Sequence, residues 1–255
     1  EKLDGVLSRR SDRLVGIVNG IDNELYDPAK DAALFANFST RSLKGKAVNK
    51  AQLQESLGLE QKADAMLIGI VSRLVKAKGF ELVQRVLDEI LTENVQLVVL
   101  GTGDPHFQDV FRDAARRYPG RVSTNIGYDD TLARRIYAAS DLLFMPSQKE
   151  PCGVSQLIAM RYGCIPLVRE VGGLQDTVDT FNPETNEGTG FSFTNYNAHD
   201  MLHVVRLAVQ VFHDKKRWTK LVKSAMQAEH SWKTSAKEYL ELYRRMLKED
   251  FHVSE

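Results

Sequence analysis

The sequence predicts an α/β fold, in which a parallel β-sheet carries helices on both faces. From residue 65 onward, short runs of β-branched and other apolar residues alternate with stretches in which apolar residues recur at helical spacing. Glycine or proline follows several of the apolar runs, where a strand would turn toward a helix. A Rossmann-like parallel sheet is therefore the expected architecture.

The strands and helices are expected to alternate along the chain. We predict strands over residues 65–71, 96–100, 122–126, 141–145 and 165–168, and helices over residues 82–91, 105–117, 132–139 and 153–162. Asp104 and Pro105 have the character of an N-cap and a first helical residue. The apolar residues between 200 and 248 predict two or three long C-terminal helices. Residues 27–61 predict only a loop or short helices.

Composition limits the kinds of partner. The chain has 255 residues, of which 43% are hydrophobic, and this is enough for one domain with a sizeable core. Its 34 Lys and Arg residues balance 34 Asp and Glu residues, so no overall field attracts nucleic acid or an anionic membrane. No apolar stretch approaches the ~20 residues of a transmembrane helix. We expect a cytoplasmic protein without nucleic-acid or membrane partners, and, because residue 1 is not methionine, part of a longer protein.

The two cysteines, Cys152 and Cys164, are predicted to be free thiols. They lack a Cys-x-x-Cys spacing and a nearby histidine cluster, so no structural metal site is expected. Their spacing alone also permits a disulfide, but a reducing cytoplasm favours free thiols.

The loops after the predicted strands collect the residues with functional chemistry. Ligands of open parallel sheets bind beyond the carboxyl ends of the strands. These loops contain two cations, an aromatic ring, a carboxylate and glycine turns: Arg73, Lys78, Tyr128, Glu150, Gly101, Gly103, Gly172 and Gly173. Arg73 and Lys78 flank a turn that closes at Gly79, beside a helix N-terminus whose N–H groups favour anions. A diphosphate fits this turn, although a solvated basic turn would have the same sequence.

The other loop residues each allow a functional and a structural interpretation. Gly101 and Gly103 would let a ligand approach the main chain or simply make a tight turn, and the missing third glycine argues against NAD and a dehydrogenase. Tyr128 could stack on a flat base or lie on the surface. Glu150 precedes Gly153 and an apolar helix, so it is either a carboxylate that reaches into a cleft beside a second anion site or a surface glutamate.

As a set, these motifs resemble the C-terminal domain of bacterial glycogen synthases and plant starch synthases. The likeness runs from about Leu3 to Leu247. It rests on the segments Gly16-Ile17-Val18-Asn19-Gly20-Ile21-Asp22, Ser72-Arg73-Leu74 with Lys78-Gly79, Pro146-Ser147, Glu150-Pro151-Cys152-Gly153, Gln156-Leu157, Gly172-Gly173-Leu174 and Asp176-Thr177-Val178. Many related retaining transferases carry a second glutamate eight positions after the first. This chain has Ile158 there, which favours the glycogen and starch synthase branch over sucrose or trehalose-phosphate synthesis.

The resemblance implies the C-terminal half of a GT-B-type two-domain glycosyltransferase. Residues 1–30 would form an interdomain segment, and residues 31–250 a nucleotide-sugar-binding domain with C-terminal helices. The implied reaction transfers glucose from ADP-glucose to the non-reducing end of an α-1,4-glucan acceptor, with retention of configuration and without a metal or cofactor. Two alternatives stay open: UDP-glucose as the donor, and a sugar-nucleotide-binding module without catalysis.

The same resemblance implies roles for the loop residues. Arg73 and Lys78 would neutralise the departing diphosphate. Glu150 would hold hydroxyl groups of the donor sugar and stabilise an oxocarbenium-like centre, and Tyr128 would stack on adenine. The rest of the donor site would come from the helix start and the glycine turns: Cys152, Gly153, Val154, Ser155, Gly101, Gly103, Gly172 and Gly173.

A catalytic part of the family is missing from the sequence. The N-terminal domain of these enzymes supplies a Lys-Thr-Gly-Gly-Leu loop and an active-site histidine, and neither motif occurs here. We therefore expect that the chain alone does not catalyse and that its partners are ADP-glucose or ADP, the glucan and the missing N-terminal domain.

Overall fold

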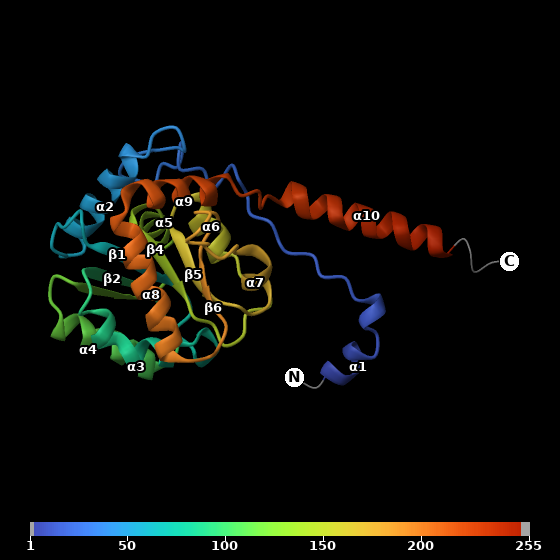
Figure 1. Ribbon diagram of the computed structural model, residues 1–255, viewed down its shortest axis with the longest axis horizontal. Helices are drawn as coiled ribbons and strands as arrows, with labels where there is room; N and C mark the ends of the chain where they lie inside the picture. The colour runs from blue at the N-terminus through green and yellow to red at the C-terminus, as the bar shows by residue number, and fades with distance from the viewer. Residues whose placement is uncertain (1–2, 251–255) are drawn as a thin grey trace.

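The computed structural model describes residues 3–250, which form a six-stranded parallel sheet with helices on both sides (Figure 1). The strands are β1 (Met66–Val71), β2 (Val95–Gly101), β3 (Val122–Ile126), β4 (Leu142–Met145), β5 (Ile165–Arg169) and β6 (Phe191–Phe193). Their order is β3-β2-β1-β4-β5-β6, and all neighbours are parallel. The order reverses between β1 and β4, so the topological switch point lies there. This arrangement confirms the predicted Rossmann-like class.

Ten helices and two short 3₁₀ turns are described between residues 3 and 250. The α-helices are α1 (Asp4–Ser8), α2 (Lys44–Ser56), α3 (Phe80–Ile90), α4 (Pro105–Arg117), α5 (Asp130–Ala139), α6 (Ser155–Arg161), α7 (Gly173–Thr177), α8 (Ala198–His213), α9 (Lys215–Gln227) and α10 (Trp232–Asp250). The 3₁₀ turns are η1 (Ser11–Arg13) and η2 (Lys76–Lys78). The sequence predicted either two or three long C-terminal helices, and the structure has three.

Both faces of the sheet are buried. Ile68 belongs to the larger apolar cluster, which includes Phe80 of α3 and reaches α4 and α8. Its neighbour Leu67 points to the opposite face and packs with Leu53 of α2 and Ile136 of α5. Because neither face meets water, the central strands are continuous apolar runs rather than alternating ones. This pattern explains why the strands could be predicted from the sequence.

The predicted elements agree with the observed bounds to within two residues at each end, with a few omissions. Asp104 caps α4 as expected, because its side chain accepts a hydrogen bond from the His106 N–H and Pro105 begins the helix. The sequence analysis missed β6 and α7, which have only three and five residues. Such short elements carry too few residues to show a period.

Helix α2 is longer than the loop or short helices expected for residues 27–61. It has 13 residues, and most of its buried side chains are polar: Lys46, Asn49, Lys50 and Gln54, with Leu53. The hydrophobic period that reveals an amphipathic helix is therefore absent.

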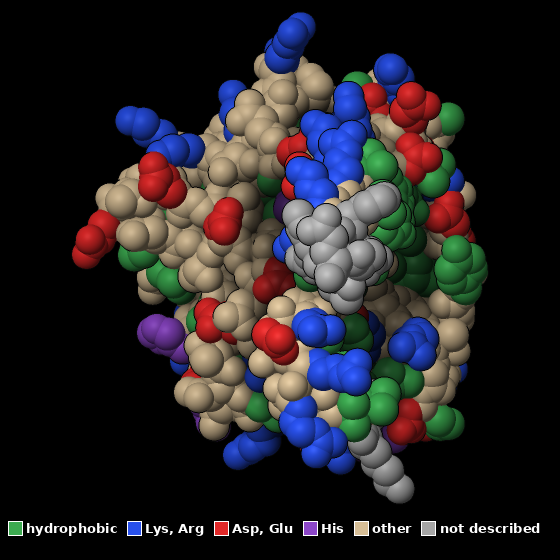
Figure 2. All heavy atoms as spheres, turned by 90° about the vertical axis from the view of Figure 1, so that its right-hand side faces the viewer, with side chains coloured by type: hydrophobic (Ala, Val, Ile, Leu, Met, Phe, Trp, Pro, Cys, Tyr) green, Lys and Arg blue, Asp and Glu red, His purple; other side chains and the backbone are tan. Residues whose placement is uncertain are grey.

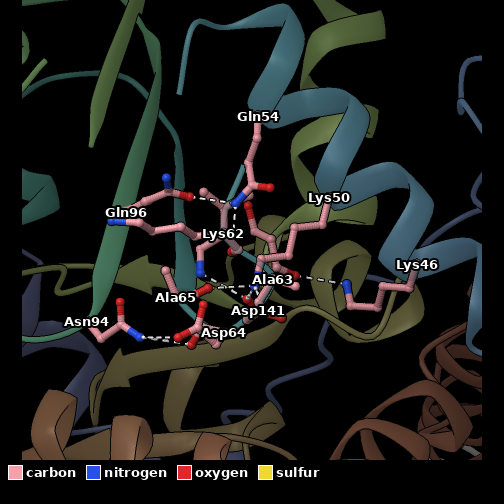
Figure 3. A network of polar contacts seen from close by, with 12 residues as sticks. Lys46, Lys50, Gln54, Lys62, Ala63, Asp64, Ala65, Asn94, Gln96 and Asp141 are labelled. Carbon is pink, nitrogen blue, oxygen red and sulfur yellow. Dashed lines mark hydrogen bonds and ion pairs between the residues drawn. The ribbon is translucent and has the colours of Figure 1, made fainter. Parts of the chain in front are cut away.

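Two buried lysines bond α2 to the amino ends of the strands (Figure 3). The Lys46 ammonium donates to the carbonyls of Ala138 (3.0 Å), Ser140 (2.8 Å) and Tyr162 (3.2 Å). The Lys50 ammonium donates to carbonyl oxygens at residues 63 and 65 and forms a 2.7 Å ion pair with Asp141. We call Lys46, Lys50 and Asp141 the polar anchor. Burial lowers the pKa of Lys46, so the surrounding oxygen atoms are needed to hold its charge.

Two segments extend away from the body of the molecule (Figure 1). They are the N-terminal stretch with α1 and the C-terminal helix α10. They leave the body at one place, where the Ile21 N–H donates to the His230 carbonyl and the Trp232 N–H donates to the Ile21 carbonyl. Both segments expose apolar side chains: Leu3, Val6, Leu7, Leu14 and Val15 on the first, and Tyr239, Leu240, Tyr243, Met246 and Leu247 on α10. Viewed toward the end of α10, hydrophobic side chains gather on one side and basic ones on another (Figure 2).

None of the helices between residues 3 and 250 combines the length and apolar character needed to cross a membrane.

The polar anchor generates a stability prediction. Asp141→Ala should lower the free energy of unfolding by about 3–5 kcal/mol, because it leaves the Lys50 cation buried without its counter-ion. The exposed Asp109 is the matched control, since its pair with Arg112 leaves the two side chains 72% and 51% exposed, respectively. Asp109→Ala should cost no more than ~0.5 kcal/mol. Urea unfolding followed by circular dichroism measures both, and equal losses would contradict a structural role for the anchor.

Candidate functional site

The loops after β1 and β4 meet at the switch point and bring a cation and a carboxylate together. Lys78, in η2, forms an ion pair with Glu150 from the β4–α6 loop. The Lys78 side chain is 19% exposed and that of Glu150 is 8% exposed. The Ser147 hydroxyl donates a further hydrogen bond to Glu150, over 3.3 Å. Glu150 is thus a buried, paired carboxylate rather than a surface glutamate.

Main-chain contacts join these two loops directly. The Ala77 carbonyl accepts hydrogen bonds from the N–H groups of Gln148 (2.9 Å) and Lys149 (3.2 Å). Gly79 has a φ of +75°, and a Cβ atom there would lie 1.9 Å from the Pro146 carbonyl oxygen. Only glycine avoids both the left-handed strain and this clash. The loop that carries Lys78 is therefore fixed against the loop that carries Glu150.

The other predicted glycines also bring neighbouring loops into close contact. A Cβ atom at each would lie 1.9–2.5 Å from a carbonyl oxygen of the next loop: Gly101 near Ser72, Gly103 near Leu74, Gly172 near Glu150 and Gly173 near Cys152. These contacts account for glycine at all four positions whether or not a ligand also approaches. They hold the loop after β2 against that after β1, and the loop after β5 against that after β4.

Arg73 and Tyr128 lie at the same carboxyl edge but are open to solvent. Arg73 is exposed just after β1. Tyr128 is 90% exposed between β3 and α5, and the neighbouring Asp129 caps α5 by accepting a hydrogen bond from Leu132. The structure thus places both side chains where a ligand could reach them, but it does not bring either into contact with Glu150.

The start of α6 offers main-chain donors beside the ion pair. Gln156 closes the preceding turn, because its side-chain amide donates to the carbonyls of Cys152 (3.1 Å) and Gly153 (3.2 Å). Val154 is 40% exposed. Within the described residues, the N–H groups of Ser155 and Gln156 have no acceptor. They are available to an anion that binds at this edge.

Both cysteines are free, as the sequence predicted. Cys152 is half-buried in the turn before α6, whereas Cys164 is fully buried. Burial raises the pKa of the Cys164 thiol to about 12. Cys164 is therefore a packing residue and not a nucleophile.

Cavity size does not identify this site. A cavity of about 20 Å³ lies between the carboxyl ends of β1 and β4, where Lys78, Ser147 and Ser155 line it. A larger cavity of about 380 Å³ lies at the opposite end of the sheet, between α2 and α9. The Lys46 and Lys50 ammonium groups in its wall are already bonded to protein oxygen atoms. The convergence of charges and free N–H groups at the switch point is the stronger indication of function.

Two side chains that organise the site were given no role on the basis of the sequence, although Ser147 belongs to one of the motifs. Ser147 donates to Glu150, and Arg169, the last residue of β5, donates to the carbonyls of Ser147 and Gln148. Arg169 could have been found by the same rule that selected the other residues, since it stands at the carboxyl end of a strand. The bonds to Ala77 involve main-chain atoms only and have no signal in the sequence.

The loop contacts generate a prediction with a matched control. Gly58 has a φ of +68°, close to that of Gly79, but a Cβ atom there would meet nothing within 4 Å. Gly58→Ala should therefore cost only the left-handed strain, about 1–2 kcal/mol. Gly79→Ala should cost a further ~1–3 kcal/mol, because its Cβ atom must push the β4–α6 loop away. Denaturant unfolding compares the two, and equal costs would contradict the close packing of the loops.

Comparisons with known proteins identify the family of the chain. Residues 54–227 match the family of glycosyl transferases group 1. A glycogen synthase from Clostridium acetobutylicum is 52% identical over 248 residues, which are 97% of this chain and 52% of that protein. A glycogen synthase from Alkaliphilus metalliredigens is 49% identical over 246 residues, again 52% of its length. The chain thus spans about half the length of the curated relatives it matches.

Solved structures of glycosyl transferases are also similar to this chain. The catalytic domain of starch synthase IV from Arabidopsis thaliana, bound to ADP and acarbose, is 36% identical with a TM-score of 0.87, over 95% of this chain and 51% of that one. A sucrose-phosphate synthase from Thermosynechococcus elongatus shares the fold, with 21% identity and a TM-score of 0.64 over 96% of this chain and 56% of that one. The chain therefore belongs to the group 1 glycosyl transferases, and within them it is the C-terminal domain of the glycogen synthase family.

Proposed function

We propose that this chain is the donor-binding half of a glycogen synthase. In the whole protein it would transfer glucose from ADP-glucose to the non-reducing end of an α-1,4-glucan, with retention of configuration. The observation that carries the proposal is the buried Lys78–Glu150 ion pair at the switch point. It occurs in a chain that is about half identical to curated glycogen synthases and similar to a starch synthase bound to ADP.

The proposed roles follow from charge. Arg73 and Lys78 stabilise the diphosphate as negative charge develops on it during departure. Lys78 is already oriented by Glu150 in the free protein, so little reorganisation is needed when the donor binds. Glu150 binds hydroxyl groups of the donor sugar, and its negative charge favours a positive centre at the reacting carbon.

The remaining edge residues complete the donor site in this proposal. Tyr128 stacks on adenine, since it is an exposed aromatic ring at the end of β3. The free N–H groups at Ser155 and Gln156 receive phosphate oxygens. The turns at Gly101, Gly103, Gly172 and Gly173 bring main chain to the ligand, with Cys152, Gly153 and Val154 beside it.

Two features support the need for a second half. The cavity of about 20 Å³ at the carboxyl edge is far smaller than the roughly 300–1,000 Å³ of a ligand pocket, so another wall must close the site. The exposed apolar side chains of α1 and α10 are suited to packing on the rest of the protein. In this arrangement residues 1–30 are the interdomain segment, and residues 31–250 are the donor-binding domain. The free thiols fit a cytoplasmic enzyme.

The first test of this proposal uses the chain alone. We expect calorimetry to detect ADP binding, because the cations and the aromatic ring are present, and weaker binding of UDP. We expect no transfer of labelled glucose from ADP-glucose to glycogen, whereas the full-length protein should transfer it. Turnover by the isolated chain would contradict the half-site, and a full-length protein that binds ADP without transfer would favour a non-catalytic module. Stronger binding of UDP would favour the UDP-glucose alternative.

A second prediction separates Lys78 from a general basic turn. Lys78→Ala should weaken ADP binding by about 1.5–3 kcal/mol, because it removes a charge-assisted contact and leaves Glu150 unpaired. AMP binding should change little, since the contact is to the distal phosphate. Lys76→Ala is the control, because Lys76 is exposed in the same turn. Calorimetry of each variant decides, and equal effects of both substitutions would mean that the turn acts only as a solvated positive surface.

A further inference from the structure

Arg169 holds the loop on which Glu150 lies. Its guanidinium donates to the carbonyls of two consecutive residues, Ser147 (3.1 Å) and Gln148 (3.0 Å). The next N–H groups of the loop, those of Gln148 and Lys149, donate to the Ala77 carbonyl on the other side. The loop before Glu150 is thus held by Arg169 on one side and by the Lys78 loop on the other.

Arg169 is itself anchored to a third loop. It donates to the Thr194 carbonyl over 3.4 Å, and its guanidinium carbon lies 5.4 Å from the centre of the Tyr196 ring. Tyr196 in turn lies beside Gly79, where its ring would be 3.4 Å from an added Cβ atom. One side chain therefore connects the loops after β4 and β6 and lies over an aromatic ring that contacts the Lys78 turn.

The geometry requires arginine and not merely a positive charge. Three nitrogens of one planar group donate to three carbonyl oxygens, and an ammonium group on a flexible stem cannot reproduce this fixed fork. None of the ion pairs formed by the described side chains involves Arg169, so its contacts are those of a main-chain clamp.

We propose that Arg169 is a positioning residue for the transfer reaction, which fixes the main chain of Ser147 and Gln148 so that Glu150 meets Lys78. This inference rests on the proposed function for its catalytic part. Because Arg169 acts on the loop of Glu150, its loss should slow turnover and leave donor binding largely unchanged.

Arg121 provides a matched control at the other end of the sheet. Its guanidinium also binds main-chain carbonyls, those of Leu91 (2.6 Å), Glu93 (2.7 Å) and Val95 (2.9 Å), just before β3 begins. Arg121→Lys therefore removes the same kind of clamp from a place without functional residues.

The experiment compares Arg169→Lys and Arg121→Lys in the full-length protein. We expect Arg169→Lys to lower kcat by about 10- to 100-fold, as a shift of ~1 Å in a catalytic group can do, while the KM for ADP-glucose and the affinity for ADP change by no more than about twofold. Both substitutions should lower the Tm by similar amounts, but Arg121→Lys should leave kcat within about twofold of the wild type. Equal kcat values for the two variants, or a loss of ADP affinity as large as the loss of kcat, would overturn the inference.

Hydrogen exchange tests the clamp without turnover. The peptide that covers residues 145–152 should exchange faster in Arg169→Lys, because the loop is no longer held so that the N–H groups of Gln148 and Lys149 face the Ala77 carbonyl. It should be unchanged in Arg121→Lys. Unchanged exchange in Arg169→Lys would overturn the inference even if activity fell. A wild-type protein that transfers no glucose would instead overturn the proposed function, and the exchange result would still decide whether Arg169 holds the loop.

Discussion

At the carboxyl edge of the sheet, neighbouring loops pack main chain against main chain, and the candidate site depends on this close approach. A Cβ atom at Gly79 would lie 1.9 Å from the Pro146 oxygen, and one at Gly172 would lie 2.2 Å from the Glu150 oxygen. The loop that carries Glu150 is therefore enclosed between the loops after β1 and β5. Any side chain at these two glycines would separate the loops, and Lys78 would lose its short contact with Glu150.

Positively charged side chains lie at both ends of the sheet, but they are fully bonded to the protein at one end and open to a ligand at the other. At the amino end, Lys46 and Lys50 are buried, and carbonyls and Asp141 surround their ammonium groups. They stabilise the attachment of α2 and have no N–H group left to donate to a ligand. At the carboxyl edge, Arg73 is exposed and Lys78 forms an ion pair with a single carboxylate, that of Glu150. Since the chain has no net charge, an anion must be attracted by a local arrangement of charges, and this one lies where parallel sheets bind ligands.

The sequence supported most of the fold because its strands are buried on both faces and its helices have apolar sides. It failed at α2, where Lys46 and Lys50 occupy buried positions that a hydrophobic pattern would assign to leucine. The carbonyl acceptors of Lys46 and the Asp141 partner of Lys50 lie about 90 or more residues away along the chain, so no local signal could have revealed them. A helix with a polar buried face can be recognised only when its distant acceptors are known.

The candidate site was predictable to the extent that its residues lie in the loops directly after the strands. That rule placed Lys78 and Glu150 on one edge, but it could not show that they form an ion pair. The pairing depends on the hydrogen bonds to Ala77 and on the clamp at Arg169, which join loops that are far apart in sequence. Local sequence selects the chemical groups, whereas contacts between loops determine their distances.

The core of this chain is more complete than its candidate site. The body has its own buried core on both faces of the sheet, as a domain that folds as a unit does. The switch point, in contrast, has charges and free N–H groups in place beside a cavity of about 20 Å³. The charged groups are therefore already arranged within this chain, whereas this cavity is too small to enclose a ligand. Exclusion of water strengthens every electrostatic contact in an active site, so under the proposed function enclosure of the donor would strengthen the contacts of Lys78 and Glu150.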